Sequence, residues 1–162
     1  MITSLTGQIH FLASCIALLT GTYVLLATKG STLHKKVGYV YVASMIVLLV
    51  TAFMIYRLFG GFGIFHVAAI VSSVTLAAGM IPVIGRKNNN WVMIHFAWMY
   101  WSVMGLYAAF ASEMITRLLP AQFFSMVGLA TGAIMTTAAI VWYRKKKVWQ
   151  NQFNSKQKNL SI

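Results

Sequence analysis

The stretch that decides the fold is WVMIHFAWMYWSVMGLYAAFASEMITR, residues 91–117. It is apolar enough to lie in lipid, and it exceeds the roughly 20 residues that a helix needs to cross the hydrocarbon core of a bilayer. Four further apolar runs of this kind occupy about residues 8–28, 37–59, 62–84 and 122–143. None of the five runs alternates apolar with polar residues, as the strands of a membrane β-barrel do. The sequence therefore predicts five transmembrane helices.

The composition is that of an integral membrane protein. Hydrophobic residues make up 59% of the 162 residues and charged residues 9%, whereas soluble domains carry about 25% charged residues. We expect an all-α integral membrane protein in contact with the lipid bilayer, an up-down bundle of four transmembrane helices with a fifth helix packed against it. The transmembrane domain is predicted over residues 1–143, and a basic cytoplasmic tail over residues 144–162.

The net charge of +12 is distributed unevenly along the chain. If the five runs alternate in direction, only Arg57 and Arg117 fall on one side. The positive-inside bias then predicts an outer N-terminus and a cytoplasmic C-terminus in the inner (plasma) membrane. In a soluble protein such a net charge would indicate a nucleic-acid partner, but the distribution of the charges in this chain argues against one. Eleven cations fall on the opposite side: Lys29, Lys35, Lys36, Arg86, Lys87, Arg144, Lys145, Lys146, Lys147, Lys156 and Lys158.

Each of the four histidines lies at or just before the N-terminal end of one of the first four runs. Because the helices are expected to alternate in direction, His10 and His66 belong to the outer level, while His34 and His95 belong to the inner level. Residues at helical spacing from a histidine share its face of the helix. Small residues occupy several of these positions, such as Ala13, Ala17 and Gly21 on the face of His10, so these faces are predicted to point into the bundle. Three of the faces also carry a hydroxyl group: Ser14, Ser73 and Ser102.

Glu113 is the only acidic residue of the chain. It follows His95 by eighteen residues, or five helical turns, so the two share a face about 27 Å apart along the axis. Glu113 is therefore predicted to point into the bundle at the outer level, where Tyr56 can approach it. The alternative is an ion pair with Arg117, four residues later on the same helix.

Two cofactor hypotheses follow from these positions. In the first, His10 pairs with His66 and His34 with His95 as axial ligands of b-type haem, which predicts an electron-transfer protein. In the second, His10, His66 and Glu113 hold a Zn or Fe ion at the outer side. Two histidines and one carboxylate leave a coordination position open, at which a water can be activated for hydrolysis.

Further interpretations remain open. The histidines, the three serines and Glu113 can form a proton relay or a transport path, or they can serve packing in a structural assembly subunit. An electron carrier would have a redox partner or a quinone as its partner. Gly128 and Gly132 form a GxxxG motif, which permits close helix contact and is consistent with docking or a homodimer.

Four segments carry a resemblance: KGSTLH (29–34), HKKVGYVYV (34–42), FGGFGIFHVAA (59–69) and HFAWMYWSVMGLYAAFASE (95–113). They resemble an uncharacterised family of bacterial predicted multi-helix membrane proteins, which implies a helical membrane fold without an agreed activity. Many members carry an Arg directly after the histidine matched by His95, where this chain has Phe96. The layout is also similar to that of transmembrane diheme b-type cytochromes, which hold one histidine pair near each membrane face.

Overall fold

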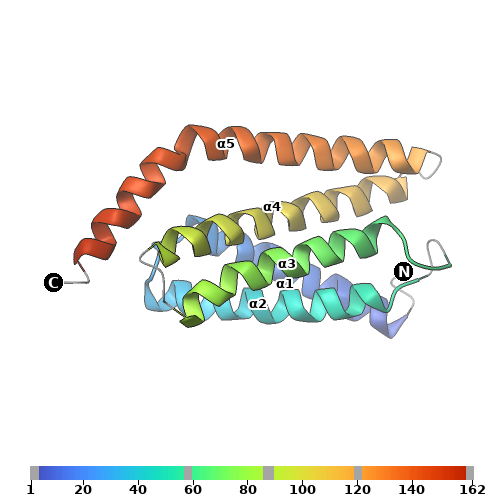
Figure 1. Cartoon of the computed structure of the whole chain (residues 1–162). Helices are drawn as coiled ribbons and strands as arrows, with labels where there is room; N and C mark the ends of the chain where they lie inside the picture. Colours follow the sequence, from blue (N-terminus) through green and yellow to red (C-terminus); the bar gives the residue numbers. More distant parts are fainter. Residues whose placement is uncertain (1–3, 57–59, 86–89, 119–121, 160–162) are drawn as a thin grey trace. The chain divides into compact units, whose positions relative to one another are not determined.

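The computed structural model describes residues 4–56, 60–85, 90–118 and 122–159, and all regular structure in these residues is helical. Each of its five helices is long and apolar enough to cross a membrane. The prediction of five membrane-length helices is thus confirmed. In chain order (Figure 1) they are α1 (Leu5–Leu26), α2 (Thr32–Phe53), α3 (Ile64–Gly85), α4 (Trp91–Leu118) and α5 (Phe123–Asn159).

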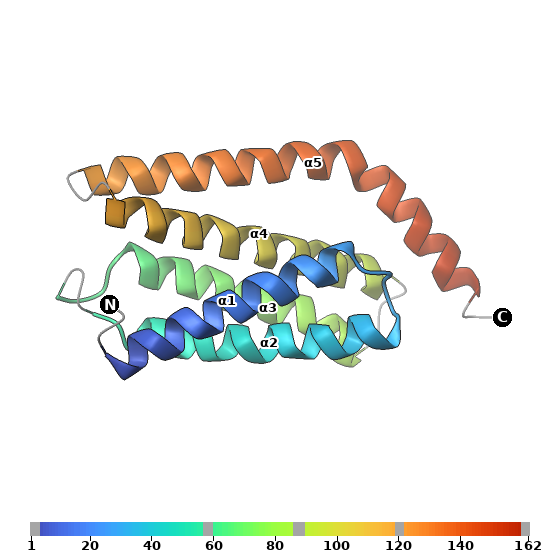
Figure 2. The ribbon, with the colours of Figure 1, turned by 180° about the vertical axis from the view of Figure 1, so that it is seen from behind.

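The chain divides into two units, Met1–Val74 and Thr75–Ile162. In unit 1, α1 and α2 lie side by side as an antiparallel pair (Figure 2), and the first part of α3 belongs to the same unit. In unit 2, α4 and α5 form the second antiparallel pair, and the last part of α3 belongs with them. The predicted up-down bundle and the direction of the termini remain predictions.

Serine hydroxyl groups set the start of the first two helices. The Ser4 side chain accepts the Gly7 N–H at 3.2 Å, and Ser31 accepts the His34 N–H at 3.1 Å. Such N-caps satisfy backbone donors that the first turn leaves unpaired. Because Ser31 caps α2, this helix begins five residues earlier than the apolar run predicts. The predicted end of this helix at residues 57–59 lies outside the described residues. So do three of the cations used to predict the orientation: Arg57, Arg86 and Lys87.

The last helix is longer than predicted. Its apolar run ends near residue 143, but α5 continues to Asn159. Lys, Arg and Gln are good helix formers, and the sequence contains neither Gly nor Pro after Gly132. The predicted basic tail is therefore mostly a continuation of α5.

Unit 1 has its core along the predicted face of α1. Ala13, Ser14 and Ala17 are buried, and Gly21 follows them on the same face. On α2, Tyr41 and Met45 are the most deeply buried side chains, at 0% and 1% exposure. Small residues on α1 leave room for these two large side chains, which explains the close packing of the pair.

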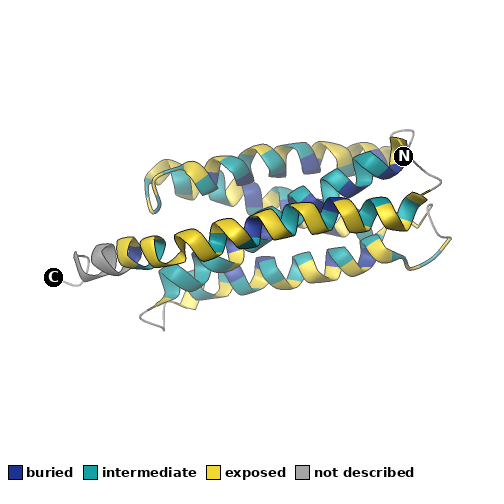
Figure 3. Cartoon of the chain, turned by 90° about the horizontal axis from the view of Figure 1, so that it is seen from above, coloured by how far each residue is buried: buried dark blue, intermediate teal, exposed yellow. Residues whose placement is uncertain are grey.

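In unit 2, buried polar groups join α4 to α5. The Tyr100 hydroxyl donates to the Ala138 carbonyl at 2.8 Å, and the hydroxyl groups of Ser112 and Thr131 are 3.1 Å apart. Much of the remaining surface of α5 is exposed, as Figure 3 shows. Because lipid supplies no hydrogen bonds, these contacts hold the two helices in register.

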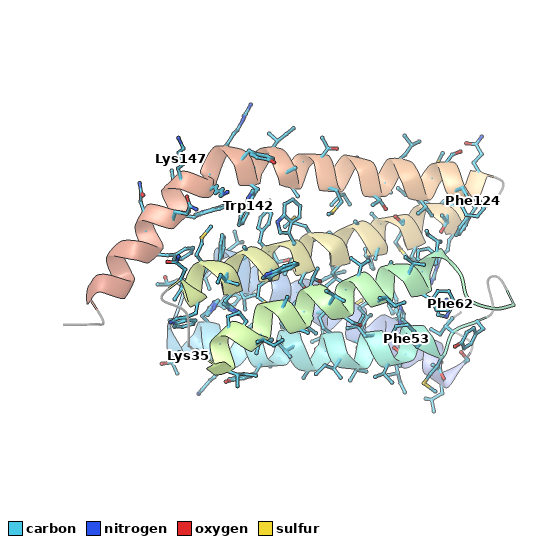
Figure 4. All side chains as sticks on the ribbon, in the orientation of Figure 1. Lys35, Phe53, Phe62, Phe124, Trp142 and Lys147 are labelled. Atoms are coloured by element: carbon cyan, nitrogen blue, oxygen red, sulfur yellow. The ribbon has the colours of Figure 1, made fainter. Side chains whose placement is uncertain are left out.

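An aromatic cluster holds the second half of α5 to the start of α4. Its centre is Phe96, whose ring centroid lies 4.9 Å from that of Trp149 and 5.1 Å from that of Phe153. Trp142 adds a stacked contact at 6.0 Å and also packs on Tyr100 at 5.3 Å. The helix bends toward α4 in this region (Figures 1 and 4), and Figure 4 shows Trp142 directed toward α4. We call Phe96, Tyr100, Trp142, Trp149 and Phe153 the aromatic cluster.

Lys29 closes the C-terminal end of α1. Its Nζ donates to the carbonyls of Val24 and Leu25 at 2.7 and 2.6 Å. A cation at this end also complements the negative end of the helix dipole. Lys29 lies in the connection between α1 and α2, where burial lowers its pKa from the ordinary 10.5 to about 8.

We predict that Lys29 reacts with acetic anhydride with an apparent pKa near 8 in the folded protein. At that pH about half of its amine is unprotonated, against about 0.3% for an ordinary lysine. Competitive labelling between pH 6 and 11, read by peptide mass spectrometry, measures this value. The same residue in the SDS-denatured protein is the control and should titrate near 10.5. Between these pKa values the unfolded chain binds more protons, so this residue makes stability rise with pH. A folded-state value near 10.5 would contradict the prediction.

Candidate functional site

His95 donates a hydrogen bond to a neighbouring helix. Its Nδ1 lies 2.7 Å from the backbone carbonyl oxygen of Gly79 on α3, within unit 2. A carbonyl oxygen can only accept, so Nδ1 carries the proton and Nε2 of the neutral ring is the acceptor nitrogen. Histidines that bind metals or haem iron commonly donate their second ring N–H to a backbone carbonyl in this way.

The local sequence of α3 makes this carbonyl reachable. Gly79 lets α4 approach closely, since a Cβ built on it would lie 2.7 Å from Met99 Sδ. Pro82 lies inside α3. It has no N–H to donate to the Ala78 carbonyl, and a proline ring crowds the preceding helical turn, which contains Gly79. Glycine and proline together therefore present the Gly79 carbonyl to His95.

His10 is in the same chemical state, within unit 1. Its Nδ1 lies 3.0 Å from Thr51 Oγ1 on α2. The Thr51 hydroxyl itself donates to the carbonyls of Val47 and Leu48, at 2.8 and 2.9 Å. The single hydroxyl proton can be shared by these two carbonyls, and we therefore assign Thr51 Oγ1 as the acceptor from His10 Nδ1, which makes Nε2 of the neutral ring the acceptor nitrogen.

His66 is in the opposite state. Its Nδ1 accepts the Gly63 N–H at 3.1 Å, so the proton of the neutral ring lies on Nε2. The residue is 4% exposed, and its Nε2 has no hydrogen-bond partner among the described residues. Tyr56 and Phe62 stack on the ring at 4.8 and 5.0 Å. His66 therefore presents a buried N–H donor and not an acceptor nitrogen.

The prediction for Tyr56 at the outer level concerns the end of α2 and the start of α3 in unit 1. Tyr56 was predicted to approach that level, and it stacks on His66. Phe53 lies 6.3 Å from the same imidazole, and Figure 4 shows Phe53 and Phe62 at the same end of this unit. His10 reaches Thr51, two residues before Phe53, so the two histidines predicted at the outer level each contact the C-terminal end of α2 or a residue that follows it.

His34 lies at the start of α2 and is half-buried. Its backbone N–H donates to the side chain of the capping Ser31. His34 belongs to unit 1 and His95 to unit 2, so their pairing stays a prediction from the sequence.

Glu113 forms an ion pair with Arg117, four residues later on α4. Both side chains are partly exposed, and such i, i+4 pairs add about 0.3–0.5 kcal/mol to stability in water. In the part of the chain that the structure describes, no group of three or more His, Cys, Asp or Glu side chains is placed to hold a metal ion. The site of His10, His66 and Glu113 stays a prediction without support from either unit.

The predicted supporting serines are mainly engaged within their own helices. Ser14 donates to the Phe11 carbonyl at 2.7 Å, and Ser73 donates to the Ala69 carbonyl at 2.8 Å. Ser102 is almost completely buried, at 1% exposure. For the first two serines, the hydroxyl proton stabilises the helix locally.

Three residues of the histidine sites escaped the sequence analysis. The hydrogen-bond partner of His10 is Thr51, and that of His95 is Gly79. Pro82 lies three residues after Gly79 and helps to make its carbonyl reachable. Pro82 carried a usable signal, because proline inside a membrane helix exposes backbone carbonyls to neighbouring groups. Thr51 carried none, since an isolated threonine in an apolar helix is common.

We predict that Gly79→Val destabilises the protein by about 2–3 kcal/mol, whereas Gly79→Ala changes stability by less than about 1 kcal/mol. The alanine methyl group meets the flexible side chain of Met99 most closely and Trp98 Cβ at an ordinary 3.4 Å, and the higher helix propensity of alanine offsets part of the clash with Met99. The branched valine forces α3 and α4 apart. Unfolding in SDS titrations measures the effect, and histidine ¹⁵N spectra report the loss of the protonated Nδ1 of His95.

The matched control is Gly105→Val on α4, where a Cβ has no atom within 4 Å. It makes the same side-chain change in a helix without the close approach. Equal destabilisation by Gly79→Val and Gly105→Val would show that the contact between α3 and α4 is not required.

Comparison with known proteins identifies a family for this chain. Neither the search of curated proteins nor the search of solved structures found a match, and the likeness to diheme cytochromes stays an analogy of layout. Residues 7–144 match the family described as Predicted membrane protein (DUF2306). This span covers most of the chain and all of the histidines. The chain therefore belongs to this family of predicted membrane proteins.

Proposed function

We propose that this membrane protein binds b-type haem through histidine and transfers electrons. The observation that carries the proposal is the hydrogen bond from His95 Nδ1 to the Gly79 carbonyl. It holds the imidazole in one orientation and makes Nε2 the acceptor nitrogen, as an axial ligand requires.

The four histidines differ in how well they fit this role. His95 and His10 fit it, because each donates its Nδ1 proton to a protein oxygen. His66 does not fit in its present hydrogen-bonding state, because its Nε2 carries the proton. We therefore place the better-supported haem on His95, with His34 as the partner that the sequence pairs with it. The second haem, on His10 and His66, has less support.

Bound haem supplies an iron that takes up and releases one electron at a time. The chain's own contribution is to orient the ligand and to exclude water. Gly79 and Pro82 present the carbonyl that fixes the ring of His95. The half-buried position of His95 and the buried Met99 and Ser102 on the same face of α4 limit access of water to that face.

The cellular setting is part of the same proposal. We place the protein in the inner (plasma) membrane with its N-terminus outside, on the strength of the charge distribution. Its electrons would be exchanged with a quinone or another redox partner. Gly128 and Gly132 are exposed on α5, with no atom within 4 Å of an added Cβ, so this face is open to a second copy of the chain.

The alternatives have less support. A Zn or Fe site of His10, His66 and Glu113 would need an acceptor nitrogen on His66, and Glu113 is engaged by Arg117. A proton relay would use Ser14 and Ser73, whose hydroxyl groups donate within their own helices. The structural-subunit hypothesis predicts neither haem nor metal in the purified protein.

The test is an optical spectrum of the detergent-purified protein after expression with added haem precursor. We predict a Soret band that shifts on reduction with dithionite, and loss of at least half of the bound haem per protein in His95→Ala. His66→Gln is the control, since it alters a more deeply buried histidine that does not fit as a ligand. It should keep the haem that depends on His95.

The outcomes separate the hypotheses. Wild-type protein without a Soret band contradicts haem binding, and so does a His95→Ala variant with unchanged haem. Elemental analysis of the same sample tests the metal alternative. Stoichiometric Zn or Fe that is lost in Glu113→Gln, in a sample without haem, would favour the three-residue metal site over our proposal.

A further inference from the structure

A run of four cations follows the apolar part of α5. Arg144, Lys145, Lys146 and Lys147 are consecutive, and all four are exposed. Figure 4 shows Lys147 directed away from α4. We call residues 144–147 the basic segment.

No side-chain carboxylate is available to neutralise the basic segment. Glu113 is the only acidic residue of the entire sequence, and Arg117 already pairs with it. Glu113 also lies near the C-terminal end of α4, whereas the aromatic cluster places the second half of α5 at the N-terminal end of α4. Four neighbouring cations without a counter-charge in the protein call for anions from outside it.

The helix geometry gives the level of the basic segment in the bilayer. From Phe123 to Trp142, α5 runs for 20 residues, or about 30 Å, which is the thickness of the hydrocarbon core. The cations begin two residues later. They therefore lie where phospholipid headgroups begin, with the exposed Tyr143 beside them as an interfacial aromatic residue.

The aromatic cluster keeps the basic segment at that level. Trp149 and Phe153 lie two and six residues after its last cation and pack on Phe96, and Phe153 is 5% exposed. The chain is thus attached to α4 on both sides of the cations, by Trp142 before them and by Trp149 and Phe153 after them. The basic segment is a fixed part of unit 2 and not a freely moving tail.

We propose that the basic segment binds the phosphate groups of anionic phospholipids in the adjacent leaflet, and that the aromatic cluster orients it for this contact. Charge complementarity selects the ligand, because each Lys or Arg near an anionic membrane surface adds to the attraction. This inference is independent of haem binding, since it involves none of the histidines.

The first test measures lipid selectivity in phosphatidylcholine vesicles that contain the protein. Spin-labelled phosphatidylglycerol and spin-labelled phosphatidylcholine are the probes, and the electron spin resonance spectrum gives the fraction of each in contact with the protein. We expect several-fold preference for phosphatidylglycerol, reduced at least threefold when all four cations are replaced by Gln (R144Q, K145Q, K146Q and K147Q). High salt should reduce it as well.

The matched control removes four charges elsewhere (K35Q, K36Q, K156Q and K158Q) and should keep more than half of the preference. Equal losses in the two variants would show a general effect of net charge and overturn the proposal. A wild-type protein without preference for phosphatidylglycerol would also overturn it, and would leave an acidic protein partner as the occupant of this surface.

The second test addresses the aromatic cluster. The double variant Trp149→Ala with Phe153→Ala keeps every cation, but it should lower the lipid preference at least twofold and speed trypsin cleavage within residues 144–147. Phe153→Leu retains apolar packing and should behave as the wild type. Circular dichroism and gel filtration verify that the variants are folded. Unchanged lipid preference in the folded double variant would show that the cations act without the cluster.

Discussion

Hydrocarbon offers no hydrogen bonds, so a polar group within these helices is stabilised when it pairs with another group of the protein. This constraint explains which residues lie against each other. His95 reaches the Gly79 carbonyl, His10 reaches Thr51, and Tyr100 reaches the Ala138 carbonyl. Each contact joins two helices, so the same bonds that satisfy polar groups also set the register of the helix pairs. Mutations that separate the helices are therefore expected to affect the chemistry of the histidines as well as stability.

Close approach in unit 2 rests on two kinds of residue. Gly79 removes the side chain at the point where α3 meets Met99 of α4. At the start of α4 large side chains make the contact instead: the rings of the aromatic cluster fill the space between α4 and α5 around Phe96. Phe96 directly follows His95 in the sequence. His95 and the anchor of the basic end of α5 thus lie in the same first turns of α4, so the proposed haem site and the proposed lipid contact share one helix.

The histidines show how far the sequence analysis could reach. Helical spacing predicted that the face of His10 would be buried, and Ala13, Ser14 and Ala17 are buried. It also gave the ion pair of Glu113 and Arg117 as an alternative, which the structure confirms. Spacing could not distinguish His66 from His10, although one presents an N–H donor and the other an acceptor nitrogen. The difference arises because Gly63 donates to His66 while Thr51 accepts from His10, and neither partner follows from periodicity.

The sequence by itself determined the class of protein. Its apolar runs match the thickness of a bilayer, and burial of apolar residues in lipid depends on composition and length more than on the details of packing. Sequence also determined the N-caps of α1 and α2, which act between residues three apart. Only the tertiary structure decided which nitrogen of His10 and His95 carries the proton, and that the second half of α5 is held by Phe96. Both depend on contacts between residues far apart in the chain, such as Gly79 and His95, which are 16 positions apart, and no local pattern records them.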